Sequence, residues 1–128
     1  MDLVALVVLL ALAEYYAFGI LVGRARGRYG VAAPAITGHP VFERYMRVQQ
    51  NTLEQLIVFI PAIAAFGHYL SARLAAGLGV VFLIARVVYL RGYVEAPEKR
   101  EAGALLSALA IGVLVIGALF GALRALAS

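Results

Sequence analysis

Arg47, Asn51 and Glu54 are the residues whose types and spacing first suggest chemistry. They are separated by four and then three positions, in the segment RYMRVQQNTLEQLIVFIP at residues 44–61. On a helix of about 3.6 residues per turn, this spacing puts the three side chains on one narrow stripe. A charge in or beside a bilayer costs about 2.5–3.5 kcal/mol, so the stripe is expected to face protein. A mutual salt bridge between helices and a site for a polar ligand both satisfy this condition.

A second polar stripe lies further along the chain. Arg86, Tyr89 and Tyr93 are separated by three and then four positions, so they are expected to share a helix face. Tyrosines at this depth are often interfacial belt residues, which is the alternative to a role in a site. Pro97 suits the first turn of the next helix and would place Arg100 at the start of that helix. Both stripes are expected to end on the same side of the molecule.

The elements that position these stripes follow from composition. The chain has 128 residues, of which 64% are hydrophobic and 14% are charged, and its mean hydropathy is +0.94. A membrane-spanning helix needs about 20 apolar residues, and the chain has no barrel-type alternation. We therefore predict an all-α integral membrane protein, one domain over residues 1–128, built as a four-helix bundle. The expected helices are residues 3–23, 42–67, 70–93 and 97–126.

The placement of positive charge predicts the orientation in the membrane. Basic residues gather in or beside the first and third connections between helices. They are Arg24, Arg26, Arg28, Arg44, Arg47, Arg91, Lys99 and Arg100. Basic residues of short loops stay in the cytoplasm, so both connections are expected there, with both termini outside. Charge that flanks hydrocarbon spans does not form a soluble basic face, so no nucleic-acid partner is expected.

Glycine, proline and cysteine add three further expectations. Residues 23–40, rich in glycine and proline, are expected to form the one long loop. Glycines of the third and fourth spans suit close helix packing. They are Gly77, Gly79, Gly112, Gly117 and Gly121. Because the chain has no cysteine, any thiol that reacts at the site must come from a ligand.

Together the two stripes resemble the motif of the MAPEG family, the membrane-associated proteins in eicosanoid and glutathione metabolism. That motif is Arg, three residues, Asn, two residues and Glu, and then Arg, two residues, Tyr, three residues and Tyr, with a final Arg. The matching residues here are Arg47, Asn51, Glu54, Arg86, Tyr89, Tyr93 and Arg100. The resemblance covers nearly the whole chain.

The resemblance implies a membrane-bound glutathione transferase that works as a homotrimer, without a metal, and binds glutathione between adjacent subunits near the cytoplasmic face. Arg100 would polarise the glutathione thiol, as in the leukotriene C4 synthase branch. The second substrate would be a lipophilic electrophile from the bilayer, and reduction of lipid hydroperoxides is left open. The implied glutathione-binding residues are Arg26, Arg47, Gln49, Asn51, Glu54, Tyr89 and Tyr93.

The implied chemistry is consistent with the residue types. Glutathione carries two carboxylates and an ammonium group, which arginines and a glutamate respectively can bind. Its reactive form is the thiolate, whereas an unperturbed thiol has a pKa of about 8.5. A guanidinium stays protonated and would stabilise the anion. Lowering the thiol pKa by about two units requires less than about 3 kcal/mol, which one well-placed arginine can supply.

Two departures from the leukotriene C4 synthase branch concern the lipid substrate more than glutathione. Gln55 follows the motif glutamate, where that branch has a tyrosine. Arg26 is followed by Gly27, where that branch has paired arginines.

Two other functions stay open at this point. Glu14 is a carboxylate within the first span, and such an acid can couple protons to export, as in small multidrug transporters of similar length. It can equally hydrogen-bond a tyrosine or a polar group of another helix. The second alternative is a non-catalytic lipid-binding scaffold of the same family. The alanine-, glycine- and arginine-rich composition suggests a bacterial cytoplasmic membrane.

Overall fold

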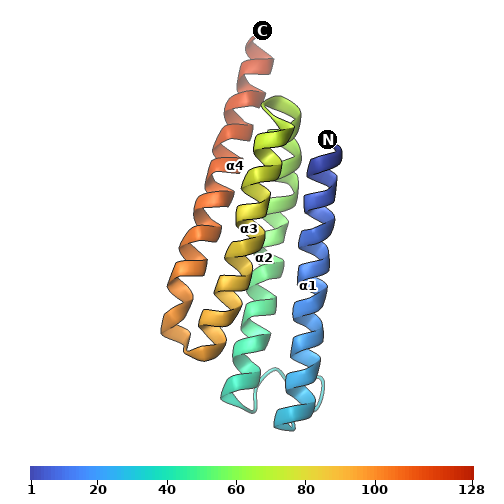
Figure 1. Cartoon of the computed structure of the whole chain (residues 1–128), viewed down its shortest axis with the longest axis vertical. Coiled ribbons are helices and arrows are strands. Elements are labelled where there is room, and N and C mark those ends of the chain that lie inside the picture. The colour runs from blue at the N-terminus through green and yellow to red at the C-terminus, as the bar shows by residue number, and fades with distance from the viewer.

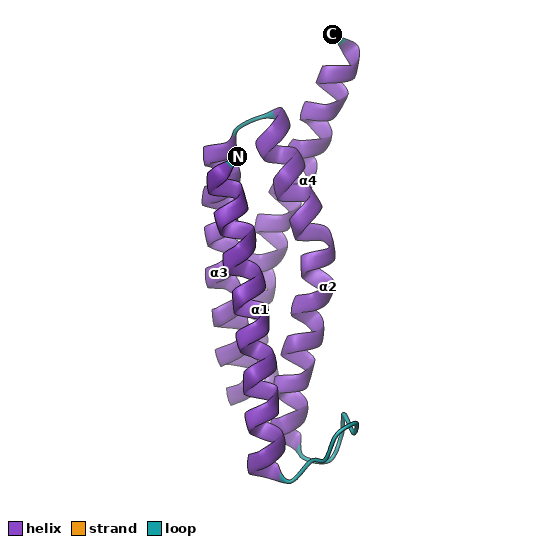
Figure 2. Cartoon of the chain, turned by 90° about the vertical axis from the view of Figure 1, so that its right-hand side faces the viewer, coloured by secondary structure: helices purple, strands orange, loops and turns teal.

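A computed structural model describes residues 1–128 and contains only helices. The helices are α1 (Asp2–Tyr29), α2 (Pro40–Tyr69), α3 (Ala72–Glu95) and α4 (Glu101–Ala127), with a short 3₁₀ helix, η1 (Pro97–Arg100), leading into α4. The four long helices run roughly along one direction (Figures 1 and 2). The predicted all-α four-helix bundle is therefore confirmed.

Local signals account for where the helices begin and end. His39 caps α2, because its Nδ1 accepts a hydrogen bond of 3.1 Å from the Val41 amide, and Pro40 occupies the first turn. Ser71 caps α3 through its Oγ, which accepts from the Leu74 amide at 3.1 Å. The end of α1 is set by Gly30, whose φ of 69° lies in the left-handed region that favours glycine.

The first helix is longer than its apolar run, and this shortens the loop. α1 continues through Tyr29 rather than ending at residue 23, so the connection to α2 covers only residues 30–39. Hydropathy marks the part of a helix that suits lipid, whereas arginine and alanine are good helix formers whatever surrounds them. The prediction of a loop over residues 23–40 was therefore wrong for its first seven residues. Pro61 lies inside α2 without ending it.

The four helices do not form a closed ring, because α1 and α4 are not packed against each other. α2 and α3 contact each other, and each also contacts both α1 and α4, so they form the centre of the bundle, with α1 and α4 on opposite sides (Figure 1). The loop at residues 30–39 and η1 lie at one end of the bundle, called here the loop end. Both termini and the α2–α3 turn lie at the other end. The predicted pairing of the first and third connections on one side is confirmed.

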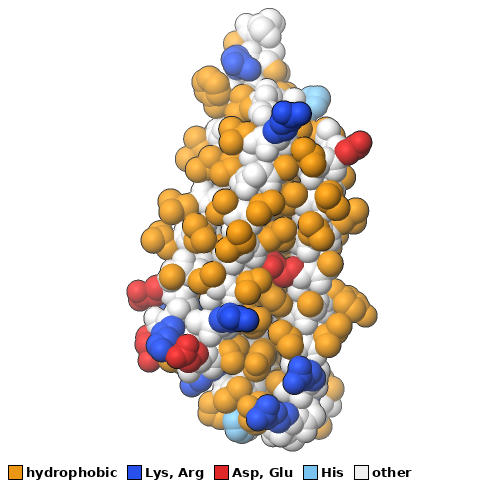
Figure 3. Space-filling model, in the orientation of Figure 1, with side chains coloured by type: hydrophobic (Ala, Val, Ile, Leu, Met, Phe, Trp, Pro, Cys, Tyr) orange, Lys and Arg blue, Asp and Glu red, His pale blue; other side chains and the backbone are white.

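The surface is that of a membrane protein. Four helical segments are long and apolar enough to cross a bilayer: α1, α2, α3 and α4 together with η1. Hydrophobic side chains cover most of the middle of the face in Figure 3, and charged side chains lie mainly toward its two ends. Inside, Phe59 and Phe82 stack with ring centroids 4.1 Å apart. The chain is therefore a multi-pass membrane protein.

Some glycines of α3 and α4 allow close helix packing. Carbon atoms added at Gly79, Gly117 and Gly121 would overlap side chains of neighbouring helices, so these three confirm the expectation. Gly77 and Gly112 have nothing within 4 Å of such an atom. The expectation was therefore wrong for these two within the protomer.

Candidate active site

Both polar stripes meet at one cavity near the loop end. The cavity has a volume of about 610 Å³, and side chains of α2, α3 and η1 form its wall. It is lined by Arg47, Gln50, Asn51, Leu53, Glu54, Tyr89, Tyr93 and Arg100. The structure thus brings together six of the eight residues that the sequence singled out for the site. We call this space the main cavity.

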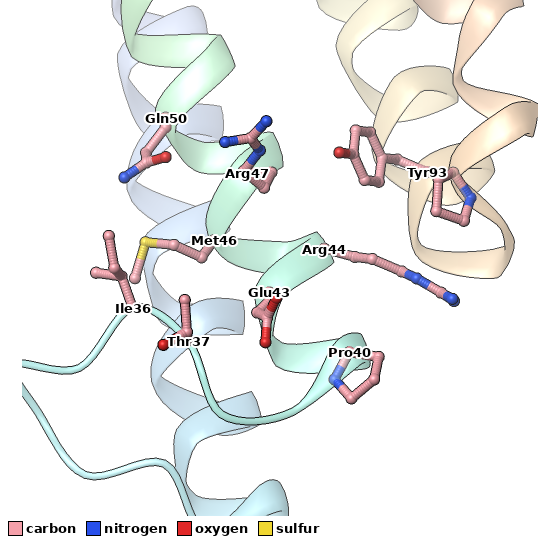
Figure 4. A pocket seen from close by; sticks show the side chains of 10 residues that line it. Ile36, Thr37, Pro40, Glu43, Arg44, Met46, Arg47, Gln50 and Tyr93 are labelled. Atoms are coloured by element: carbon pink, nitrogen blue, oxygen red, sulfur yellow. The ribbon is translucent and has the colours of Figure 1, made fainter.

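A neighbouring cavity extends the polar wall toward the loop. It has a volume of about 440 Å³ and shares Arg47, Gln50 and Tyr93 with the main cavity. Ile36 and Thr37 of the loop form its outer edge. In Figure 4, Tyr93 of α3 points its hydroxyl toward Arg47 of α2 across the open space. A polar ligand can therefore reach the main cavity from the loop end.

Helix periodicity accounts for the α2 side of the main cavity. Arg47, Asn51 and Glu54 share the face toward the cavity, while Val48 and Thr52, one position further along, are buried. The tyrosines of α3 form the opposite wall. Tyr89 is buried and Tyr93 half-buried, and their rings meet edge to face with centroids 5.6 Å apart.

Arg100 is positioned by η1. Its guanidinium donates a hydrogen bond of 2.7 Å to the Pro97 carbonyl and lies 5.7 Å from the centre of the Tyr93 ring. Gly92 of α3 and Gly103 of α4 allow this turn to lie close against α3, because neither has a side chain. A carbon added at Gly92 would contact the Lys99 carbonyl, and one at Gly103 would contact the backbone of Tyr89. Two close backbone approaches thus place an exposed arginine at the edge of the main cavity.

The charged side chains of the main cavity do not form ion pairs with one another. Arg47 and Glu54 are both exposed, and no ion pair joins them. The single ion pair of the chain is between Lys99 and Glu95, at 2.6 Å on the surface. The interpretation of the α2 stripe as a mutual salt bridge is therefore wrong, and the charges are free to bind a ligand. No group of His, Cys, Asp and Glu side chains that could hold a metal ion is present.

Arg86 does not line the main cavity, although its spacing predicted a face shared with Tyr89 and Tyr93. It lies inside the bundle with 1% of its surface exposed. Its guanidinium donates to Asn51 Oδ1 at 2.7 Å, to Thr52 Oγ1 at 2.8 Å and to Ser107 Oγ at 3.2 Å. Sequence reasoning missed Thr52 and Ser107, although hydroxyl groups within apolar spans are a signal for a buried polar partner.

Arg26 and Gln49 lie away from the main cavity within the protomer. Arg26 belongs to the last turn of α1 rather than to a loop, because α1 is longer than expected. It donates to the Ala35 carbonyl at 2.7 Å and lies 4.9 Å from the centre of the Phe42 ring. Gln49 lines a separate cavity of about 300 Å³ with Tyr15, Tyr16, Gly19 and Ile20. Both residues therefore belong to the side of the bundle formed by α1 and α2.

Glu14 is half-buried on α1 and has no direct partner. Its Oε1 is the one buried side-chain oxygen or nitrogen without a hydrogen bond. Glu14 and Arg86 do not form an ion pair. The hydrogen bond to a tyrosine or to a polar group of another helix, which was one of the two alternatives for Glu14, is absent.

Comparisons with known proteins agree with the motif. A sequence model of the MAPEG family matches residues 4–120. An uncharacterised protein of Synechocystis is 48% identical over 93% of this chain and 87% of its own length. Human microsomal glutathione S-transferase 2 is 40% identical over 94% of this chain and 80% of its own. Bovine leukotriene C4 synthase is 36% identical over 94% and 81%. The chain therefore belongs to the MAPEG family.

Proposed function

We propose that this protein is a membrane-bound glutathione transferase that activates the thiol of glutathione for attack on lipophilic electrophiles. The observation that carries the proposal is the main cavity, where Arg47, Glu54 and Arg100 meet without ion pairs among themselves. The human relative is named as a glutathione transferase, which supports the same activity. The bovine relative is named as leukotriene C4 synthase.

The charges of the main cavity complement those of glutathione. Arg47 can bind a carboxylate through two parallel hydrogen bonds. Glu54 is the one acid of the cavity wall and suits the ammonium group. Asn51, Tyr89 and Tyr93 supply neutral hydrogen-bonding groups between the charges. We infer that these five residues hold the tripeptide.

Arg100 is the catalytic residue in this proposal. Its guanidinium would lie beside the sulfur and stabilise the thiolate, while the thiol proton passes to water. The thiolate then attacks the electrophilic carbon, so that a sulfur–carbon bond forms and the leaving group departs. The electrophile would come from the bilayer, since apolar side chains surround the helices on the outside. Reduction of lipid hydroperoxides is a second reaction open to the same thiolate.

We further propose that the site is completed in a homotrimer. Arg26 and Gln49 lie on the α1 and α2 side of the protomer, away from the main cavity, so they can act on its ligand only from a neighbouring subunit. A ring of three protomers would bring the two sides together. The mass of the protein in detergent is expected to be that of a stable trimer. A stable dimer would contradict the assembly.

Replacing Arg47 or Glu54 by alanine is expected to weaken glutathione binding ten-fold or more. A hydrogen bond to a charged group contributes about 1.5–3 kcal/mol, and neither side chain has a protein partner that could replace the ligand. Titration calorimetry with the detergent-solubilised protein measures the effect. Arg91→Ala and Glu98→Ala are charge-matched controls outside both cavities. Normal binding by both test variants, together with lowered thermal stability, would indicate a structural role instead.

Two alternative functions differ from a transferase in whether they use glutathione. A proton-coupled transporter would use Glu14, whose buried Oε1 has no partner, and that activity would need no glutathione. A non-catalytic scaffold would bind lipid without turning over glutathione. We also propose that the loop end, where most basic residues gather, faces the cytoplasm of a bacterium and that both termini lie outside.

A further inference from the structure

Arg86 joins three helices from inside the bundle. It extends from α3 and donates hydrogen bonds to Asn51 and Thr52 of α2 and to Ser107 of α4. With 1% of its surface exposed, it is the largest side chain that is fully buried. A buried guanidinium is costly unless most of its N–H groups are bound. Its partners therefore have little freedom to turn away from it.

One of these partners also lines the main cavity. Asn51 is half-buried, with Arg86 on its inner side and the cavity on its outer side. A guanidinium has five N–H donors and no acceptor. The atom of the Asn51 amide that meets Arg86 must therefore be the oxygen, and the distance of 2.7 Å from Arg86 Nη2 to Asn51 Oδ1 is that of a strong hydrogen bond.

We propose that Arg86 is a positioning residue of the glutathione site: it holds the Asn51 oxygen inward, so that the Asn51 Nδ2 group faces the main cavity as a hydrogen-bond donor. The inference rests on the proposed function for its ligand. It adds a direction that the residue type alone does not give, because an asparagine side chain can present either a donor or an acceptor.

The accessibility of Asn51 Nδ2 supports this orientation. The hydrogen bonds around Asn51 use its oxygen, and no protein group accepts from its Nδ2. Nδ2 is nevertheless not a buried atom without a partner, since Glu14 Oε1 is the only such atom in the chain. Solvent therefore reaches Nδ2. Because Asn51 lines the main cavity, the donor opens into that space.

Arg86 also contacts a second residue of the cavity wall, through a cation–π contact rather than a hydrogen bond. Its guanidinium carbon lies 4.4 Å from the centre of the Tyr89 ring, close enough for a cation–π contact. Tyr89 is buried and lines the main cavity together with Asn51. One buried cation thus holds two neighbouring residues of the wall, one on α2 and one on α3.

The orientation defines the ligand chemistry at this point. A donor at Asn51 requires an acceptor on the ligand, which in glutathione is a carboxylate or a peptide carbonyl oxygen. The ammonium group is excluded from this position, and it would bind one turn further along α2, at Glu54. We therefore expect the tripeptide to lie with an oxygen against Asn51 and its amine toward Glu54.

Asn51→Asp tests the direction of the amide. Aspartate keeps an oxygen for Arg86 but replaces the outward donor by a second oxygen, which repels an acceptor on the ligand. We expect glutathione binding to weaken ten-fold or more, while the melting temperature stays the same or rises. Unchanged or tighter binding would overturn the inference. The parent protein is titrated first, because failure of the parent to bind glutathione counts against the proposed function and not against the orientation.

Arg86→Lys tests whether Arg86 acts through Asn51. Lysine keeps the charge but cannot bind Asn51, Thr52 and Ser107 with the fixed geometry of a guanidinium. We expect weaker glutathione binding in the parent background and no further weakening in the Asn51→Ala background. Ser107→Ala is the matched control, since it removes one Arg86 contact away from the cavity and is expected to lower stability without changing affinity. Equal losses in both backgrounds would overturn the positioning role.

Discussion

Arg100→Ala is expected to keep most of the affinity for glutathione and to lose about 25-fold in turnover at pH 7. That factor is the fall in thiolate fraction if the thiol pKa returns from about 6.5 to its unperturbed value of about 8.5. Affinity is expected to be kept because, in the proposed site, Arg47 and Glu54 rather than Arg100 would bind the carboxylates and the amine. Activity is expected to recover as the pH rises, since the pKa is lowered in the parent and the advantage disappears once the thiol ionises unaided.

The direct measurement is the ultraviolet absorbance of the bound thiolate, titrated against pH in the parent and in the variant. Lys99→Ala is a suitable control, because Lys99 is the neighbouring cation but forms its ion pair with Glu95 and does not line the main cavity. Its titration curve is expected to match that of the parent. Identical curves for the parent and Arg100→Ala would remove Arg100 from the chemistry.

Gly103→Val is expected to destabilise the protein by about 3 kcal/mol or more, the upper end of the cost of overpacking. The first carbon of the new side chain would lie 2.5 Å from the Tyr89 Cα, and backbone atoms cannot rotate away as a flexible side chain can. Relief requires α4 to move away from α3. Because Arg100 lies just before Gly103, the same movement would carry it away from the main cavity and lower turnover in the protein that still folds.

Gly112→Val provides the matched control for this prediction. It is the same substitution in the same helix, but nothing lies within 4 Å of the added carbon. Thermal unfolding in detergent compares the two variants. Equal melting temperatures would mean that the contact between α3 and α4 at Tyr89 is not needed to hold the bundle together.

The sequence was sufficient to predict the helices and the two polar stripes, because both depend on periodicity along the chain. Apolar runs of about 20 residues mark spans, and spacings of three and four mark a face. The spacing of Arg47, Asn51 and Glu54 was thus enough to place them together, as the main cavity confirms. The same reasoning missed the end of α1. Hydropathy marks the part of a helix that suits lipid, and α1 continues beyond that part.

Periodicity does not say what a face meets, and this limited the prediction of the site. Arg47 and Arg86 both lie on polar stripes, yet one is exposed at a cavity and the other is buried. The difference comes from Thr52 and Ser107, which accept hydrogen bonds from Arg86 inside the bundle. Only the packing of three helices brings these groups together. The placement of Arg26 and Gln49 away from the main cavity depends on packing in the same way.

Arg26 and Gln49 lie on the α1 and α2 side of the protomer. In the proposed homotrimer they would act in the site of a neighbouring subunit, so two impaired chains would complement each other. A chain without Arg100 has an intact α1 and α2 side, and a chain without Arg26 and Gln49 has an intact main cavity. In a mixed ring of three, roughly one site in three would join the intact half of each chain. With equal and random mixing about three quarters of the rings are mixed, so about a quarter of all sites would work. Co-expression would then show interallelic complementation, in which two impaired variants together give more turnover at pH 7 than either variant alone.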